Sequence, residues 1–191
     1  MLVRKIPMIR IREQYKKLRI DRKWIVLGLI LALLSFFVKI WPIIFLSAFC
    51  VVNAILLSID RYINAPLDLE FSTFSAVLMT KAFGLNWGIL VAVMTKIAAI
   101  LYNKNVRVDH FFMIGGYVIA ALIANILPGS VVVIGVLATI VVNIYTVFIS
   151  RYVTGLSNYE IMTYGASNTI FNIVLFIGFS EFFYAVMIIL R

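Results

Sequence analysis

Long apolar runs recur along the chain from residue 24 to residue 190, and they are too many for a single aqueous core in 191 residues. Lipid offers no hydrogen bonds to the backbone, so every run that crosses a membrane must be a helix or part of a closed barrel. The runs are continuous and lack the in-out alternation of barrel strands. The sequence therefore predicts an all-α, polytopic helical membrane protein with six to seven transmembrane helices in one bundle.

Turn and charge signals divide the apolar sequence into seven segments. They cover about residues 24–40, 43–59, 71–83, 87–102, 111–127, 131–150 and 165–190. Several are close to the lower limit for a membrane span, which needs about 20 residues. The third segment is the shortest, and it can be re-entrant or merge with a neighbour, which would leave six crossings instead of seven.

Positive charge is concentrated at the N-terminus. The cations there are Arg4, Lys5, Arg10, Arg12, Lys16, Lys17, Arg19, Arg22 and Lys23, against Glu13 and Asp21. Positive charge beside a first span holds that end in the cytoplasm, so we expect a multi-pass protein of the cell membrane with a cytoplasmic N-terminus. A cleaved signal peptide is the competing interpretation, but its charged region would be unusually long. We divide the chain into a basic cytoplasmic amphipathic segment, residues 1–23, and a transmembrane helical bundle, residues 24–191.

Three charged residues inside or next to the apolar segments are candidates for ligand binding or coupling. Lys96 lies well inside the fourth segment, and Glu70 comes within reach of it if the third and fourth segments form a hairpin at Gly84. An ion pair between them is one interpretation, and snorkelling of Lys96 to the inner surface is the other. Glu181 lies among aromatic residues of the last segment and can pair with Lys39 or Lys81, or take up a proton.

Polar side chains also recur at helical spacing. They are Thr139, Asn143, Thr146 and Ser150 in the sixth segment, and Tyr164, Asn168 and Asn172 in the last. Hydrogen bonds between helices explain such residues, and a polar cavity open to the cytoplasm is the alternative. With Lys96, Glu70 and Glu181, the three asparagines complete the candidate ligand or coupling residues.

Small residues recur at four-residue spacing on two of the expected helices. They are Gly84, Gly88 and Ala92 in the fourth segment, and Gly116, Ala120 and Ala124 in the fifth. Such faces let another helix approach closely. We expect them to serve packing inside the bundle, with docking of a partner subunit as the alternative.

Catalytic patterns are absent from the sequence. It contains no nucleophile elbow, no zinc-binding His-Glu-x-x-His and no phosphate-binding loop. The lone Cys50 is expected to be a packing residue, and the lone His110 a solvated residue in a loop or at a helix start. We therefore expect no enzyme, no catalytic residue, no metal and no cofactor.

Residues 66–103 resemble a stretch that recurs in the substrate-binding S components of energy-coupling-factor transporters. In that family a short helix ends in a Phe-Gly turn and a glycine-spaced helix follows, and the matching residues here are Phe83, Gly84 and Gly88. The rod-shape-determining MreD-type membrane proteins look similar. The resemblance implies six helices, a micronutrient bound near the outer face, and docking through small residues to a membrane partner driven by ATPases. Two features depart from the S components: the seven segments and the polar residues of the cytoplasmic half.

These observations lead us to expect an integral membrane protein that is a solute-binding subunit of a transport complex. A partner would supply the energy, because the chain has no nucleotide-binding motif. A non-transporting scaffold or assembly factor that recruits membrane or cytoplasmic proteins is the second interpretation, and an ion channel or proton-coupled carrier is the third. The expected partners are the lipid bilayer, a transport partner with ATPase subunits or other membrane proteins, and a small solute, but no nucleic acid.

Overall fold

The computed structural model describes residues 22–37, 40–59, 67–104 and 106–191, in which helices predominate and no strand occurs. The chain divides into two units, residues 1–40 and 41–191, each described by itself. Helix α2 (Arg22–Phe37) belongs to the first unit, and its apolar sequence follows Arg22 and Lys23 without interruption. The predicted basic segment, apart from these two residues, lies outside the described part of the chain.

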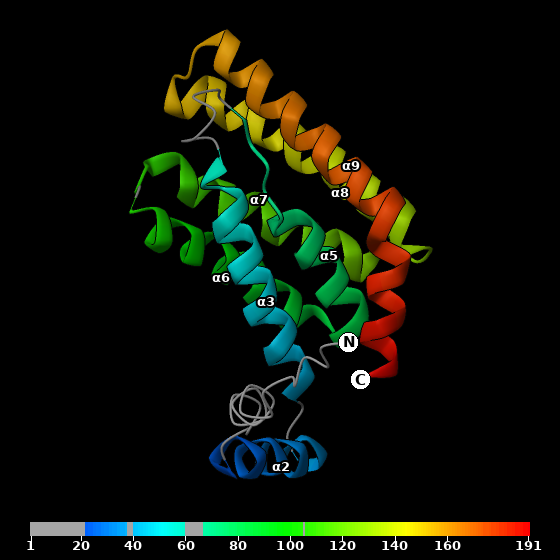
Figure 1. Ribbon diagram of the computed structural model, residues 1–191. Coiled ribbons are helices and arrows are strands. Elements are labelled where there is room, and N and C mark those ends of the chain that lie inside the picture. Colours follow the sequence, from blue (N-terminus) through cyan, green and yellow to red (C-terminus); the bar gives the residue numbers. More distant parts are fainter. Residues whose placement is uncertain (1–21, 38–39, 60–66, 105) are drawn as a thin grey trace, which may run out of the picture. The chain divides into compact units, whose positions relative to one another are not determined.

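The second unit is a bundle of helices (Figure 1). Its elements are α3 (Ile40–Leu56), α5 (Ser72–Phe83), α6 (Leu85–Asn103), α7 (Val108–Ile126), α8 (Val131–Ile149), the π-helical turn η1 (Ser150–Thr154) and α9 (Asn158–Ile189). Four helices are long and apolar enough to cross a membrane, namely α6, α7, α8 continued by η1, and α9, whereas the apolar α3 is shorter. The chain is therefore an integral membrane protein built from α-helices. Among the described residues, fewer helices meet the length requirement than the six to seven crossings that the sequence predicts.

The helix ends follow from local sequence signals. Gly84 has a φ of +100°, which only glycine adopts readily, and this single residue joins α5 to α6 as the predicted hairpin requires. Ser157 and Glu160 form a capping box, in which each side chain accepts a hydrogen bond from the other residue's backbone N–H. Helix α9 therefore starts at Asn158, ahead of the predicted start of the last apolar segment near Gly165.

Helix α5 is the centre of the bundle, because it contacts α6, α7, α8 and α9 (Figure 1). Ten of its 12 residues are buried. At a rise of about 1.5 Å per residue it is about 18 Å long, too short for a hydrocarbon core of about 30 Å. The non-helical residues 67–71 precede it and bury Asp68 and Glu70. Such backbone is tolerated at membrane depth only where protein surrounds it.

Close helix contacts depend on glycine at two positions. A Cβ atom on Gly88 of α6 would lie 1.7 Å from Thr80 Oγ1 of α5, and one on Gly135 of α8 would lie 2.0 Å from the Phe176 ring of α9. Phe176 is fully buried, and its ring centroid lies 5.1 Å from that of Phe74 in α5. The four helices α5, α6, α8 and α9 can approach this closely because neither glycine has a side chain.

The predicted small-residue faces are buried within this unit. The buried members are Gly88, Ala92, Gly116, Ala120 and Ala124, whereas Gly84 forms the half-buried turn. A Cβ atom on Gly116 would lie 3.2 Å from the Tyr145 ring of α8. Packing among the chain's own helices therefore accounts for both faces.

Candidate functional site

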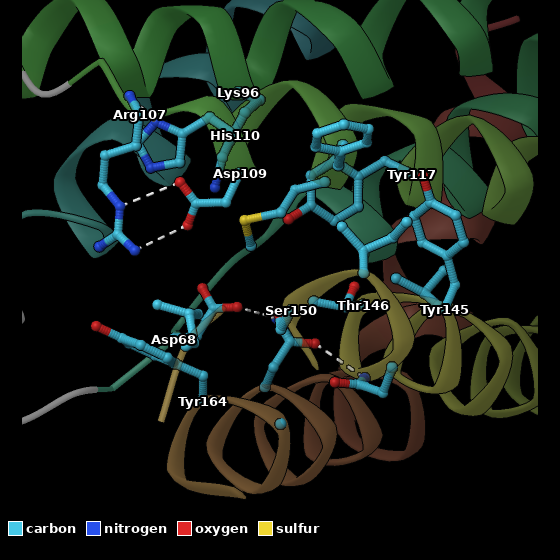
Figure 2. A pocket seen from close by; sticks show the side chains of 18 of the residues that line it. Asp68, Lys96, Arg107, Asp109, His110, Tyr117, Tyr145, Thr146, Ser150 and Tyr164 are labelled. Atoms are coloured by element: carbon cyan, nitrogen blue, oxygen red, sulfur yellow. Dashed lines mark hydrogen bonds and ion pairs between the residues drawn. The ribbon is translucent and has the colours of Figure 1, made fainter. Parts of the chain in front are cut away.

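A cavity of about 90 Å³ lies among residues 67–68 and helices α6, α7, α8 and α9 (Figure 2). Its polar wall consists of Asp68, Lys96, Arg107, Asp109, His110, Tyr117, Asn143, Tyr145, Thr146, Ser150, Tyr164 and Asn168. A water needs about 10–15 Å³ of this kind of volume, so the cavity has room for about six to nine waters or one small organic solute. The cavity is thus small, and its lining combines this polar wall with apolar side chains such as Met113 and Val142.

Helical spacing explains how the sequence builds this wall. Asp109, Met113 and Tyr117 follow one another at intervals of four residues in α7, and all three line the cavity. Residues that are three or four apart share one helix face. Tyr145 and Ile149 present a similar face of α8. The cavity therefore lies where the polar faces of α7, α8 and α9 meet.

A buried ion pair lies at one wall of the cavity. Lys96 Nζ is 2.8 Å from Glu70 Oε2, and the two side chains are only 3% and 0% exposed. The Tyr117 hydroxyl donates to the same Oε2 atom, and Ser72 Oγ donates to Oε1 at 2.8 Å. Three hydrogen bonds compensate a carboxylate that has no access to water. The predicted ion pair is thus present, and Lys96 does not snorkel.

Glu70 lies behind the cavity wall. Lys96 and Tyr117 both line the cavity, whereas Glu70 does not, so the two donors stand between the carboxylate and the cavity. Asn53 of α3 holds the backbone beside Glu70, because its Oδ1 accepts from Phe71 N at 2.6 Å. Its amide group donates to Ser72 Oγ at 3.2 Å. The carboxylate is therefore fixed by its own hydrogen bonds and by those of the neighbouring backbone.

A chain of asparagines connects α8 and α9 to residues 67–71. Asn143 Nδ2 donates to Asn168 Oδ1 at 3.1 Å, and Asn168 Nδ2 donates to Asp68 Oδ2 at 3.0 Å. Asn172 Nδ2 donates to the carbonyl oxygen of Glu70 at 3.1 Å. Within the described part of the chain, the buried Asn172 Oδ1 has no donor. The asparagines thus hold the non-helical segment that carries both buried carboxylates.

A second ion pair lies at the beginning of α7. Arg107 binds Asp109 through two contacts, Nε to Oδ1 at 3.1 Å and Nη2 to Oδ2 at 3.0 Å, with side chains 39% and 16% exposed. Burial lowers the pKa of the Arg107 guanidinium, but Asp109 and Tyr164 raise it by more, so the net shift in pKa is upward. Figure 2 shows this pair and His110 on one side of the cavity, with Asp68 and Tyr164 on the other. Charges of both signs therefore face the cavity from α7 and from residues 67–71.

The structure brings together five of the six predicted ligand or coupling residues. Lys96, Asn143 and Asn168 line the cavity, and Glu70 and Asn172 bond to this network from behind. The sixth, Glu181, is an exposed residue far along α9 and makes no hydrogen bond or ion pair with any described residue.

The pairing of Glu181 with Lys81 that the sequence suggested does not form. Lys81 Nζ instead donates to the carbonyl oxygen of Leu127 at 2.9 Å. This oxygen belongs to the residue that caps the C-terminus of α7, where a cation is favourable. Lys39, the other suggested partner, lies outside the described residues.

Sequence reasoning missed the contribution of residues 107–110. These residues were expected in a polar link, with His110 solvated in a loop or at a helix start. Helix α7 begins at Val108, so His110 does lie at a helix start, but both Asp109 and the half-buried His110 line the cavity. The spacing from Asp109 to Tyr117 was a usable signal. The described residues contain no group of three or more His, Cys, Asp or Glu side chains that could hold a metal ion.

Comparison with known protein families, with curated proteins and with solved structures gives no match for this chain.

Proposed function

We propose that this membrane protein binds a small polar solute in the cavity and works as the solute-binding subunit of a transport complex. The observation that carries the proposal is the charged and polar wall inside a bundle of apolar helices. Ionisable groups inside a membrane protein are costly and mark ligand and ion pathways. Cavities between the helices of a bundle are common ligand sites. A scaffold that recruits other proteins does not need a cavity between its helices.

In this proposal all seven apolar segments are embedded, six or seven of them cross the cell membrane, and the N-terminus is cytoplasmic. The cavity then opens to the cytoplasm, because Arg107 lies in the link between α6 and α7. A partner with ATPase subunits supplies the energy. The hairpin of α5 and α6 at Gly84 is a feature that the resemblance to S components implies. The small-residue faces are buried within the bundle, so in this proposal the partner docks on other surfaces of the chain.

Native mass spectrometry of gently extracted protein tests the proposal. We expect a small molecule at one copy per chain in the unaltered protein. Thr146→Phe fills the cavity from α8 and should remove it. Ile144→Phe is the matched control, because Ile144 lies on the same helix, is 66% exposed and does not line the cavity.

The outcomes separate the main classes of function. Retention of the molecule in Thr146→Phe, with loss in Ile144→Phe, would place the binding site elsewhere. Capture of proteins or lipids without any solute would favour a scaffold. Ion conduction by the purified chain alone would favour a channel.

A further inference from the structure

We propose that the cavity binds a small oxyanion, such as a carboxylate, at Lys96 and that each bound anion is accompanied by one proton taken up by Glu70. This inference rests on the proposed solute-binding function and names the class of solute. In it, the ammonium group of Lys96 exchanges the carboxylate of Glu70 for the carboxylate of the solute. The protein would then bind an acid in two parts, the anion at Lys96 and the proton at the adjacent Glu70.

Lys96 is placed for this exchange because it belongs to both the ion pair and the cavity wall. Its ammonium group has three N–H donors, and one of them goes to Glu70 Oε2 at 2.8 Å. Among the described residues it has no second hydrogen-bond acceptor, although its nitrogen also lies 5.9 Å from the centroid of the Tyr117 ring. A carboxylate oxygen of a solute in the cavity can therefore reach the Lys96 ammonium group, which already binds a carboxylate oxygen of Glu70.

Charge balance requires the proton. An anion added beside the neutral Lys96 and Glu70 pair would leave an uncompensated negative charge, and burying such a charge is costly. A proton on Glu70 restores neutrality, because the pair then consists of Lys96 with the solute anion, beside a neutral carboxyl group. The Tyr117 hydroxyl can turn from donor to acceptor and receive the new O–H of Glu70. Each binding event thus adds one anion and one proton and leaves the net charge of the site unchanged.

The other ionisable groups around the pair do not replace Glu70 in this balance. Asp109 is bound to Arg107 in α7, and Asp68 accepts from Asn168 of α9. Tyr145 of α8 and Tyr164 of α9 contribute hydroxyl groups to the wall. His110 of α7 also lines this wall, and imidazole is the side chain most often used for proton uptake in proteins. A variant of His110 is therefore a necessary control.

Calorimetric titration of the purified full-length protein tests the exchange, with acetate, lactate, succinate and inorganic phosphate as probes. Where binding of one anion requires uptake of one proton, the Kd of the anion rises tenfold for each unit by which the pH is raised. Titrations in two buffers of different ionisation enthalpy give the number of protons directly. We expect a value of one for the unaltered protein and for the His110→Gln variant.

Substitutions of Lys96 and Glu70 distinguish the role of the ammonium group from that of the carboxylate. Glu70→Gln mimics the protonated carboxyl group, so we expect anion binding with a Kd that no longer depends on pH. The double variant Lys96→Met with Glu70→Gln contains neither charge of the pair, and we expect it to fold and to lose anion binding at least a hundredfold. Lys81→Met removes a lysine that binds the Leu127 carbonyl oxygen outside the cavity, and it should change neither Kd nor the proton number.

Two results would overturn the exchange. One is anion binding by the unaltered protein without proton uptake, and the other is a folded Glu70→Gln protein that binds none of the probes. A neutral or cationic solute that is retained, and lost in Thr146→Phe, would overturn the oxyanion inference and leave the proposed function standing. The absence of any solute would overturn both.

Discussion

Removing one member of the buried ion pair should destabilise the protein far more than removing both. Lys96→Met leaves Glu70 with a fully buried side chain and only the hydroxyl donors of Tyr117 and Ser72. The least costly response is uptake of a proton. A glutamate in water has a pKa of about 4.3 and each pKa unit corresponds to about 1.36 kcal/mol, so at pH 7 this costs about 3.7 kcal/mol. We expect a loss of about 3 to 4 kcal/mol.

The same geometry predicts the stability of the other single variant and of the double variant. Glu70→Gln leaves the ammonium group of Lys96 at the cavity wall, where water can reach it, and we expect a smaller loss of about 2 to 3 kcal/mol. The double variant contains neither charge of the pair and should lose at most about 2 kcal/mol. The sum of the two single losses then exceeds the loss in the double variant by about 4 kcal/mol, whereas the losses at independent sites add to within about 0.5 kcal/mol.

Reversible unfolding in mixed detergent micelles measures these differences. The loss in Lys96→Met should shrink by about 1.4 kcal/mol for each pH unit below 7, because the folded variant holds a proton that the unfolded chain releases. Lys81→Met is the control and should cost about 1 kcal/mol for its hydrogen bond to Leu127. Additive single losses, or a loss below about 1 kcal/mol in Lys96→Met, would show that the pair is hydrated and refute the reasoning.

Two further predictions concern packing and capping. Gly135→Ala places a Cβ atom 2.0 Å from the buried Phe176 ring, so we expect thermal unfolding to show a loss of about 1 to 3 kcal/mol in stability, which Phe176→Leu should restore in part. Gly178→Ala is the control and should not destabilise the protein, because nothing lies within 4 Å of the added Cβ atom. Equal losses in the two alanine variants would contradict the packing. Ser157→Ala removes the acceptor for Glu160 N at 3.2 Å and should cost about 1 kcal/mol, with faster hydrogen exchange in the first turn of α9; unchanged exchange there would contradict the capping box.

Sequence patterns located the helices better than their ends. All seven apolar segments coincide with helices, because continuous apolar runs in lipid leave the backbone few alternatives. The start of α9 was missed because residues 158–164 are polar enough to resemble a loop. The capping box of Ser157 and Glu160 was present in the sequence and marks that start correctly.

The candidate site was predictable only where two elements are neighbours in the chain. The Lys96 and Glu70 pair followed from a hairpin at Gly84, which fixes how α5 and α6 run side by side. The contact of Asn168 with Asp68 joins residues 100 positions apart. Helical spacing shows which residues share a face, but not which faces meet, so this contact had to come from the structure. For the same reason the sequence could offer Lys81 only as one of two partners for Glu181, and the structure shows Lys81 bound to the Leu127 carbonyl oxygen instead.

The central position of α5 has a consequence for biosynthesis. This helix contains Ser72, Thr73, Ser75, Thr80 and Lys81, and it is too short to span a bilayer by itself. Helix α3, which contacts it through Asn53 and Ser72, precedes it in the chain, but α6, α7, α8 and α9 all follow it and leave the ribosome later than it does. Its polar groups and the carboxylates before it cannot enter lipid unaccompanied. Insertion of this part of the chain must therefore wait, beside the insertion machinery or at the membrane surface, until α9 has been synthesised.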